Sequence, residues 1–144
     1  MMRCSRAAIV AEARSWIGTP YRHQASLKGV GADCLGLLRG VWRGVIGAEP
    51  ETVPPYGDHE RDELLLEAAR RNLREIGAYQ FRDGDVLLFR WQPHLPARHV
   101  GIATSPSTMV HAQSQRGRRG AARSVVADAV GGGVRISWAV GSRQ

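Results

Sequence analysis

The 144-residue sequence predicts a single α+β domain over residues 1–144, a length that suits one domain with its own hydrophobic core. Two observations indicate this fold class. Apolar residues recur at helical spacing in the first half of the chain, whereas short apolar runs between turn residues occupy the second half. Helices that come first and strands that follow are typical of an α+β domain.

The first expected helix covers residues 5–17. Ser5 can cap its N-terminus, because a serine oxygen accepts a hydrogen bond from a backbone N–H of the first turn. Gly18 with Pro20 ends the helix. Residues 18–33 are rich in glycine and polar side chains, and we expect them to form a loop.

A second helix is expected from Asp33 or Cys34 to about Ile46, with Gly47 as its stop signal. Its apolar stripe comprises Leu35, Leu38, Val41, Trp42 and Val45. A proline-punctuated connection leads to a third helix, expected over residues 58–76. Acidic residues at the start of that helix and basic residues at its end suit the helix dipole.

The second half of the chain predicts short strands. Residues 86–89, 99–103 and 108–113 form the first group, and a later pair lies near residues 124–126 and 134–138. Their length and their flanking turn residues favour strand over helix. Because only a few residues separate the second run from the third, we expect these two to pair as a hairpin.

The net charge of +7 is the unusual feature of the composition, and all basic residues except Lys28 are arginine. A basic protein associates with polyanions such as nucleic acid, anionic membranes or wall polymers. Aromatic residues make up only 6% of the chain and no nucleic-acid recognition motif is present, so no specific nucleic-acid partner is expected. We interpret the basic segment 116–123 as a solvated surface that touches anionic wall polymer.

No apolar run approaches the roughly 20 residues that a membrane span needs. The N-terminus lacks the pattern of a secretory signal, so we expect synthesis in the cytoplasm without one. Two cysteines do not make a disulfide framework. A disulfide between Cys4 and Cys34 is the less favoured alternative. It would leave Cys34 without the free thiol that a nucleophile needs.

The segment 31–37 contains Cys34, the candidate nucleophile. A cysteine in the first turn of a helix feels the positive end of the dipole, so we expect a thiol pKa below the free value of about 8.5. Asp33 can cap the helix, and Gly31 and Gly36 would let a substrate approach. The alternative, which this segment alone favours, is an inert buried cysteine.

Two histidines on the expected strands are candidate partners. His99 lies at the mouth of a buried strand and is the candidate general base, because the pKa of histidine lies near working pH. In the hairpin, His111 would lie beside His99 and orient its ring. Each histidine alone fits an ordinary structural role, but a helix cysteine followed by strand histidines is the arrangement expected of a cysteine nucleophile.

No metal or other cofactor is expected. The remaining histidines occupy expected loops without mutual ligand spacing, and they are His23, His59 and His94. His23 follows Tyr21 closely and is a weaker candidate for the rim of a cleft.

Five blocks in this order resemble the NlpC-type cell-wall peptidases of the papain-like superfamily. The blocks are residues 19–21, 31–37, 83–89, 98–102 and 110–112, within a match of about residues 8–113. The versions found among phage tail and gene transfer agent proteins are the most similar. The resemblance implies a papain-like NlpC-type fold, with N-terminal helices packed on a small antiparallel β-sheet.

The same resemblance implies roles for individual residues. Cys34 would be the nucleophile, His99 the base and His111 the orienting third residue. Tyr21 would line the cleft, and Asp33 would help to receive the free amine of the L-alanine of the substrate. The implied reaction cuts peptidoglycan stem peptides between D-γ-glutamate and the diamino acid.

The resemblance also implies a place of action. The protein would be associated with phage-like tail proteins or a virion and would act on the cell wall in the periplasm. Leu35 stands where many members have serine, and the connection between Gly47 and Asp83 is longer than in the minimal domain. Two alternatives stay open: an amidase or acyltransferase on the same cysteine and histidine, and a catalytically idle structural tail module.

Overall fold

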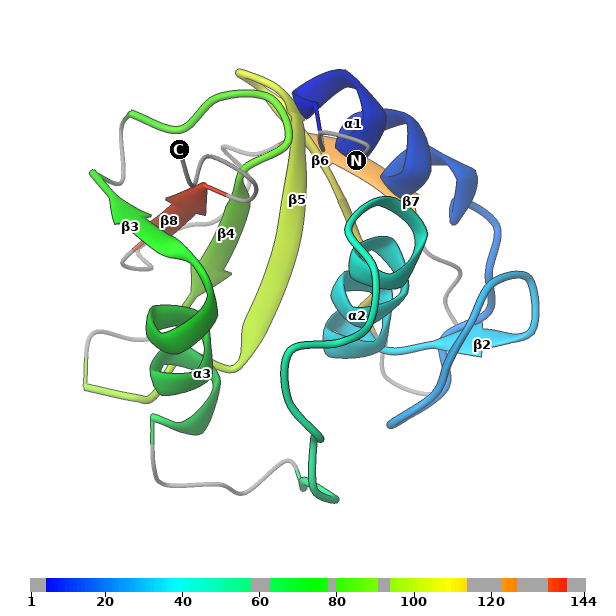
Figure 1. Ribbon diagram of the computed structural model, residues 1–144, viewed down its shortest axis with the longest axis horizontal. Coiled ribbons are helices and arrows are strands. Elements are labelled where there is room, and N and C mark those ends of the chain that lie inside the picture. Colours follow the sequence, from blue (N-terminus) through cyan, green and yellow to red (C-terminus); the bar gives the residue numbers. More distant parts are fainter. Residues whose placement is uncertain are drawn as a thin grey trace.

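The computed structural model describes residues 5–57, 63–77, 80–90, 94–113, 123–126 and 135–139. Three helices and eight strands lie in these ranges (Figure 1). In chain order they are α1 (Arg6–Ser15), β1 (Ser26–Leu27), β2 (Gly31–Ala32), α2 (Cys34–Val45), α3 (Leu64–Asn72), β3 (Arg74–Ile76), β4 (Val86–Phe89), β5 (His99–Ser105), β6 (Thr108–His111), β7 (Arg123–Val126) and β8 (Arg135–Ala139).

Six of the strands form one antiparallel sheet in the order β3-β8-β4-β5-β6-β7. The pairing of β5 with β6 confirms the predicted hairpin and sets Ile102 opposite Val110. A β-bulge between Ala103 and Ser105 shifts the register near the turn. Strand β8, which is late in the sequence, lies in the interior of the sheet between β3 and β4.

All three helices contribute to a core on one face of the sheet. Figure 1 shows α1 beside α2, α2 next to β5, and α3 next to β3. The buried residues of this core are Ile9, Ala13, Trp16, Ala32, Leu37, Val41, Leu66, Ala69, Val86, Leu88, Ala97, Val100, Ile102 and Val110. Alternation along the strands sends the side chains between them to the other face.

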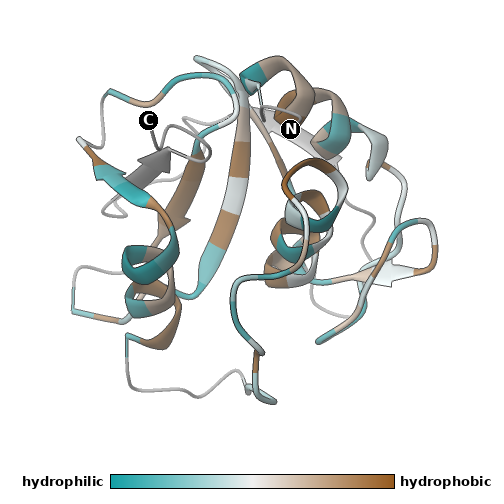
Figure 2. Ribbon diagram, in the orientation of Figure 1, coloured by the Kyte–Doolittle hydropathy of each residue, from teal (hydrophilic) through white to brown (hydrophobic). Residues whose placement is uncertain are grey.

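The second face carries a smaller cluster. It consists of Leu87, Phe89, Ala103 and Met109, with Phe81 packed against them. Figure 2 shows the resulting pattern on β5, where hydrophobic bands alternate with paler ones. Both faces of β4 are buried, and its four residues form a continuous apolar run without polar alternation.

The predicted helix starts are confirmed at both caps. Ser5 accepts a hydrogen bond from the backbone N–H of Ala8 at 3.0 Å, and α1 begins at the next residue. Asp33 caps α2 in the same manner through the backbone N–H of Gly36 at 2.7 Å. These short polar side chains satisfy donors that a helix N-terminus otherwise leaves unpaired.

One predicted helix boundary and one predicted loop are wrong. The helix expected to end at residue 76 ends as α3 at Asn72, because Leu73 is extended and β3 pairs with β8 instead. Part of the loop expected over residues 18–33 forms the short hairpin of β1 and β2, which turns at Gly29 with a φ of 79°. In both places pairing with another segment overrides the local pattern.

Other expectations fall on parts of the chain that are not described. Cys4, the expected start of the third helix at residues 58–62 and most of the basic segment 116–123 lie outside the described residues. None of the described helices is long and apolar enough to cross a membrane.

Candidate active site

Cys34 is the first residue of α2 and lies against the start of β5. Its thiol donates to the backbone oxygen of Arg98 at 3.9 Å, and the backbone of Val100 also hydrogen-bonds to the sulfur. These two residues flank His99 in the sequence. The structure therefore brings the candidate nucleophile to the strand end at which the candidate base begins β5.

The first turn of α2 is held by close packing against the preceding loop. A Cβ atom at Gly36 would lie 1.8 Å from the carbonyl oxygen of Ala25, so only glycine fits there. A Cβ atom at Gly31 would lie 2.9 Å from the Cβ of Arg22. We expected these glycines to admit substrate, but the space beside them is filled by residues 22–25. They fix the loop against the helix that carries Cys34.

The two candidate histidines meet across neighbouring strands. His99 Nε2 and His111 Nδ1 lie 2.6 Å apart, and the ring centroids are separated by 4.9 Å. Both residues are buried, with 7% and 6% of their surface exposed. The predicted proximity of the two rings is confirmed. Because one ring nitrogen of His99 is engaged by His111, the ring is held in one orientation.

A glycine between the strands makes room for this pair. A Cβ atom at Gly101 would lie 2.9 Å from the Sδ of Met109 and 3.3 Å from the Cβ of His111. Gly101 is two residues after His99 on the same strand, so its side chain would share the face with both histidines. The hydrogen atom at this position lets β6 bring His111 alongside.

The surroundings favour uncharged forms of both reactive groups. Burial, and after it the charge of Asp33, raise the pKa of the Cys34 thiol to about 12, although nearby backbone hydrogen bonds oppose the rise. Burial, and after it repulsion from His111, lower the pKa of His99 to about 3. The expectation of a lowered thiol pKa is thus wrong, because desolvation and Asp33 outweigh the helix N-terminus.

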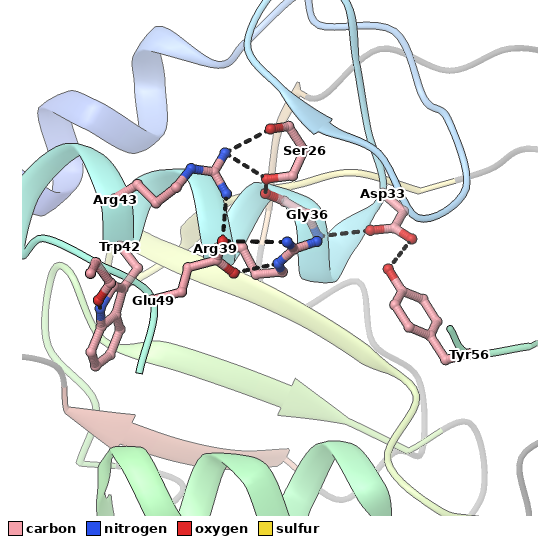
Figure 3. A network of polar contacts seen from close by, with 9 residues as sticks. Ser26, Asp33, Gly36, Arg39, Trp42, Arg43, Glu49 and Tyr56 are labelled. Carbon is pink, nitrogen blue, oxygen red and sulfur yellow. Dashed lines mark hydrogen bonds and ion pairs between the residues drawn. The ribbon is translucent and has the colours of Figure 1, made fainter. Parts of the chain in front are cut away.

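Asp33 is buried with 2% of its surface exposed, and both carboxylate oxygens accept hydrogen bonds. Besides Gly36, the backbone N–H of Gln24 donates to it at 2.6 Å, and the hydroxyl of Tyr56 donates to the same oxygen. Asp33 thus joins three segments around the start of α2, and Figure 3 shows its bonds to Gly36 and Tyr56. Its contact with a substrate amine stays a prediction.

Tyr21 lies beside the same turn. Its backbone forms a parallel bridge to Ala32, which precedes Cys34 by two residues, and the N–H of the next residue donates to the Ala32 oxygen at 3.1 Å. The Tyr21 side chain is partly exposed. The structure therefore places the tyrosine close to the nucleophile in the chain fold, while its role in lining a cleft stays a prediction.

Tyr56 and Gln24 belong to the site although no sequence pattern predicts them. Tyr56 follows two prolines in the connection between α2 and α3, and no local pattern connects it with Asp33. His23 was noted as a candidate for a cleft rim, and its Nε2 lies 3.0 Å from the Tyr56 carbonyl oxygen. These contacts could be found only in the folded chain.

Among the described residues, no group of three His, Cys, Asp or Glu side chains could hold a metal ion. The arrangement of a helix-terminal thiol next to a strand that carries an oriented imidazole can perform nucleophilic acyl transfer.

Comparison with known proteins finds solved structures with a similar fold. The NlpC/P60 domain of the peptidoglycan hydrolase SagA is 27% identical, with a TM-score of 0.66 over 92% of this chain and 97% of that chain. An NlpC/P60 family protein from Bacillus cereus ATCC 10987 is 18% identical with the same TM-score, and this chain spans 39% of its length. The second likeness concerns the fold alone.

No curated protein sequence matches the chain. A model of the NlpC/P60 family, however, matches residues 18–129, which include every candidate site residue. With the α+β papain-like fold described above, the chain belongs to the NlpC/P60 family.

Proposed function

We propose that the protein is a cell-wall cysteine peptidase that hydrolyses peptidoglycan stem peptides at the bond between D-γ-glutamate and the diamino acid. One observation carries the proposal: the Cys34 thiol contacts the start of β5 while His99, the first residue of that strand, is hydrogen-bonded to His111. Family membership and the likeness to a peptidoglycan hydrolase domain support the substrate class.

The proposed reaction uses these positions. As the substrate displaces water, His99 takes the proton of Cys34, and the thiolate attacks the amide carbonyl. The backbone N–H of Cys34 at the start of α2 stabilises the developing oxyanion. His99 then protonates the leaving amine, and water hydrolyses the acyl-enzyme. Burial favours the uncharged forms of both groups, so in this proposal the proton moves as the substrate binds.

His111 acts on the orientation of His99. Its Nδ1 engages His99 Nε2, so the other ring nitrogen of His99 is the one that exchanges a proton with the thiol. In this proposal Tyr21 lines the substrate cleft, and Asp33 helps to receive the amine of the terminal L-alanine. Neither role requires a cofactor.

Digestion of purified diaminopimelate-type muropeptides, read by mass spectrometry, tests the proposal. We expect an L-Ala-D-Glu fragment with wild-type protein and none with Cys34→Ala, whose fold is checked by circular dichroism. If no product forms although a thiol probe alkylates Cys34, the site acts on a different acyl group, as an amidase or acyltransferase would. If the thiol is also unreactive, the structural-module alternative replaces the peptidase.

We also propose that the protein works as a component of a phage-like tail and reaches the wall in the periplasm with it. The resemblance to tail and gene transfer agent peptidases supports this location. Mass spectrometry of purified particles tests it, and recovery of the protein only in free form would contradict it.

A further inference from the structure

The segment between α2 and α3 crosses the surface near Cys34 and is fixed to both helices. We call residues 49–57 the strap. At its start, Glu49 accepts hydrogen bonds from Arg39 at 2.5 and 3.3 Å and from Arg43 at 3.1 Å, both on α2. Figure 3 shows these two arginines converging on the one carboxylate.

Two residues later a second carboxylate attaches the strap to α3. Glu51 accepts from Arg71 at 2.8 and 3.2 Å and from Asn72 at 3.0 Å. Partly exposed ion pairs each add little to stability. Together, however, the two sets of contacts restrict the path of the strap, and they deliver Tyr56 near its end to the start of α2.

At that end Tyr56 contacts the loop before Cys34 with three different groups. Its hydroxyl donates to Asp33, its carbonyl oxygen accepts from Gln24 Nε2 at 2.5 Å, and its ring meets the His23 ring edge-on at 5.4 Å. Gln24 has a φ of 62°, in the left-handed region that non-glycine residues rarely occupy. Such strain persists only where surrounding contacts hold it.

The hydroxyl of Tyr56 and the thiol of Cys34 are linked through one buried charge. Asp33 directly precedes Cys34, and its negative charge opposes formation of the thiolate. Burial, the hydrogen bond to Asp33 and the nearby Cys34 all raise the pKa of Tyr56, so the hydroxyl stays protonated and donates. A donor dipole aimed at a carboxylate offsets part of its charge and also fixes its orientation.

We propose that Tyr56 is a positioning residue for Cys34: its hydroxyl holds the Asp33 carboxylate and offsets its charge beside the nucleophile, so that the thiolate can form. The proposal rests on the proposed function for its kinetic consequence. The strap then has a structural role. Its contacts through Glu49 and Glu51 bring the Tyr56 hydroxyl to Asp33, which lies 23 residues earlier in the chain.

Tyr56→Phe removes the hydroxyl and keeps the ring. In the alkylation of Cys34 by iodoacetamide, measured from pH 6 to pH 10, we expect slower reaction and a profile displaced to higher pH. On muropeptides kcat falls about tenfold while KM stays within about twofold, the size expected when one hydrogen bond to a charged group is lost. Glu51→Gln, which loosens the strap but keeps the Tyr56 hydroxyl, is the comparison variant and should displace the profile in the same direction by less than Tyr56→Phe does.

If the strap merely covers the thiol, the opposite result is expected. Tyr56→Phe would then speed alkylation at every pH without displacing the profile, and Glu51→Gln would do so too. Either that outcome or an unchanged profile overturns the proposal. Asp33→Asn supplies an independent variant: it should move the alkylation profile to lower pH, and adding Tyr56→Phe should cause no further displacement, because the charge on which Tyr56 acts is gone.

The alkylation readout does not require peptide hydrolysis. If wild-type protein cuts no muropeptide but Tyr56→Phe displaces the profile, the proposed function fails and the role of Tyr56 stands. If wild type cuts muropeptides and the variant matches it in kcat and in its alkylation profile, the proposed function stands and the role of Tyr56 fails.

Discussion

Gly36→Ala should destabilise the protein, because the added methyl group has no place to go. Its Cβ would lie 1.8 Å from the Ala25 carbonyl oxygen, a backbone atom, so the loop must move by more than about 1 Å. Overpacking of this kind costs about 1–3 kcal/mol. The movement also stretches the bonds from the Asp33 N–H to Ala25 O and from the Gln24 N–H to Asp33, at about 1 kcal/mol each.

Alanine regains about 1 kcal/mol in helix propensity over glycine. The net loss in the free energy of unfolding is therefore about 2–4 kcal/mol, which corresponds to a fall in Tm of about 10 °C for a chain of this size. Urea unfolding followed by circular dichroism measures the first quantity, and calorimetry the second.

The same helix offers a control in Gly44→Ala. A Cβ atom there would meet the Glu12 carboxylate at 2.7 Å, and that flexible side chain can move aside. We expect this variant to lie within about 1 kcal/mol of wild type, since the propensity gain offsets the adjustment. Equal stability of the two alanine variants would refute the packing argument for Gly36.

Two further predictions concern the histidine pair. His99→Ala should reduce muropeptide hydrolysis more than His111→Ala, since loss of the base costs more than loss of its orientation; equal losses would contradict these roles. Because the pKa of His99 is lowered to about 3, its contribution to stability is complete above about pH 6.5 and is lost as the pH falls. Between pH 6.5 and 5 the unfolded chain gains a proton that the folded chain does not, which lowers the free energy of unfolding by up to about 2 kcal/mol. His99→Gln should flatten the urea-measured stability over this window, and an unchanged slope would show that other groups cause it.

The sequence alone located the residues of the site whose positions depend on local rules. Asp33 marks the start of α2 because a short acidic side chain before an apolar helical stripe is a cap signal. The pairing of His99 with His111 follows from two short strands with a tight turn between them. In both cases contacts between near neighbours in the chain carry the information.

The rest depends on contacts between distant segments. Residues 73–76 look helical from their composition, but they form β3 because β8 supplies a partner. Tyr56 reaches Asp33 only through the fixed path of the strap, which no periodicity reveals. The pKa of the Cys34 thiol depends on how much water the fold excludes, and a helix terminus read from sequence does not include that desolvation.

The position of β8 bears on the order in which the chain assembles. Strand β4 pairs with β5 on one side and with β8 on the other, yet the 45 residues 90–134 separate the end of β4 at Phe89 from the start of β8 at Arg135.

 Until those residues have left the ribosome and β8 has docked, β4 presents one row of unpaired backbone groups along a continuous apolar segment. The hairpin of β5 and β6 can form early, but closure of the sheet around β4 has to wait for the late strand. Synthesis of this protein therefore passes through a stage in which its most hydrophobic strand is an open template for pairing with other chains.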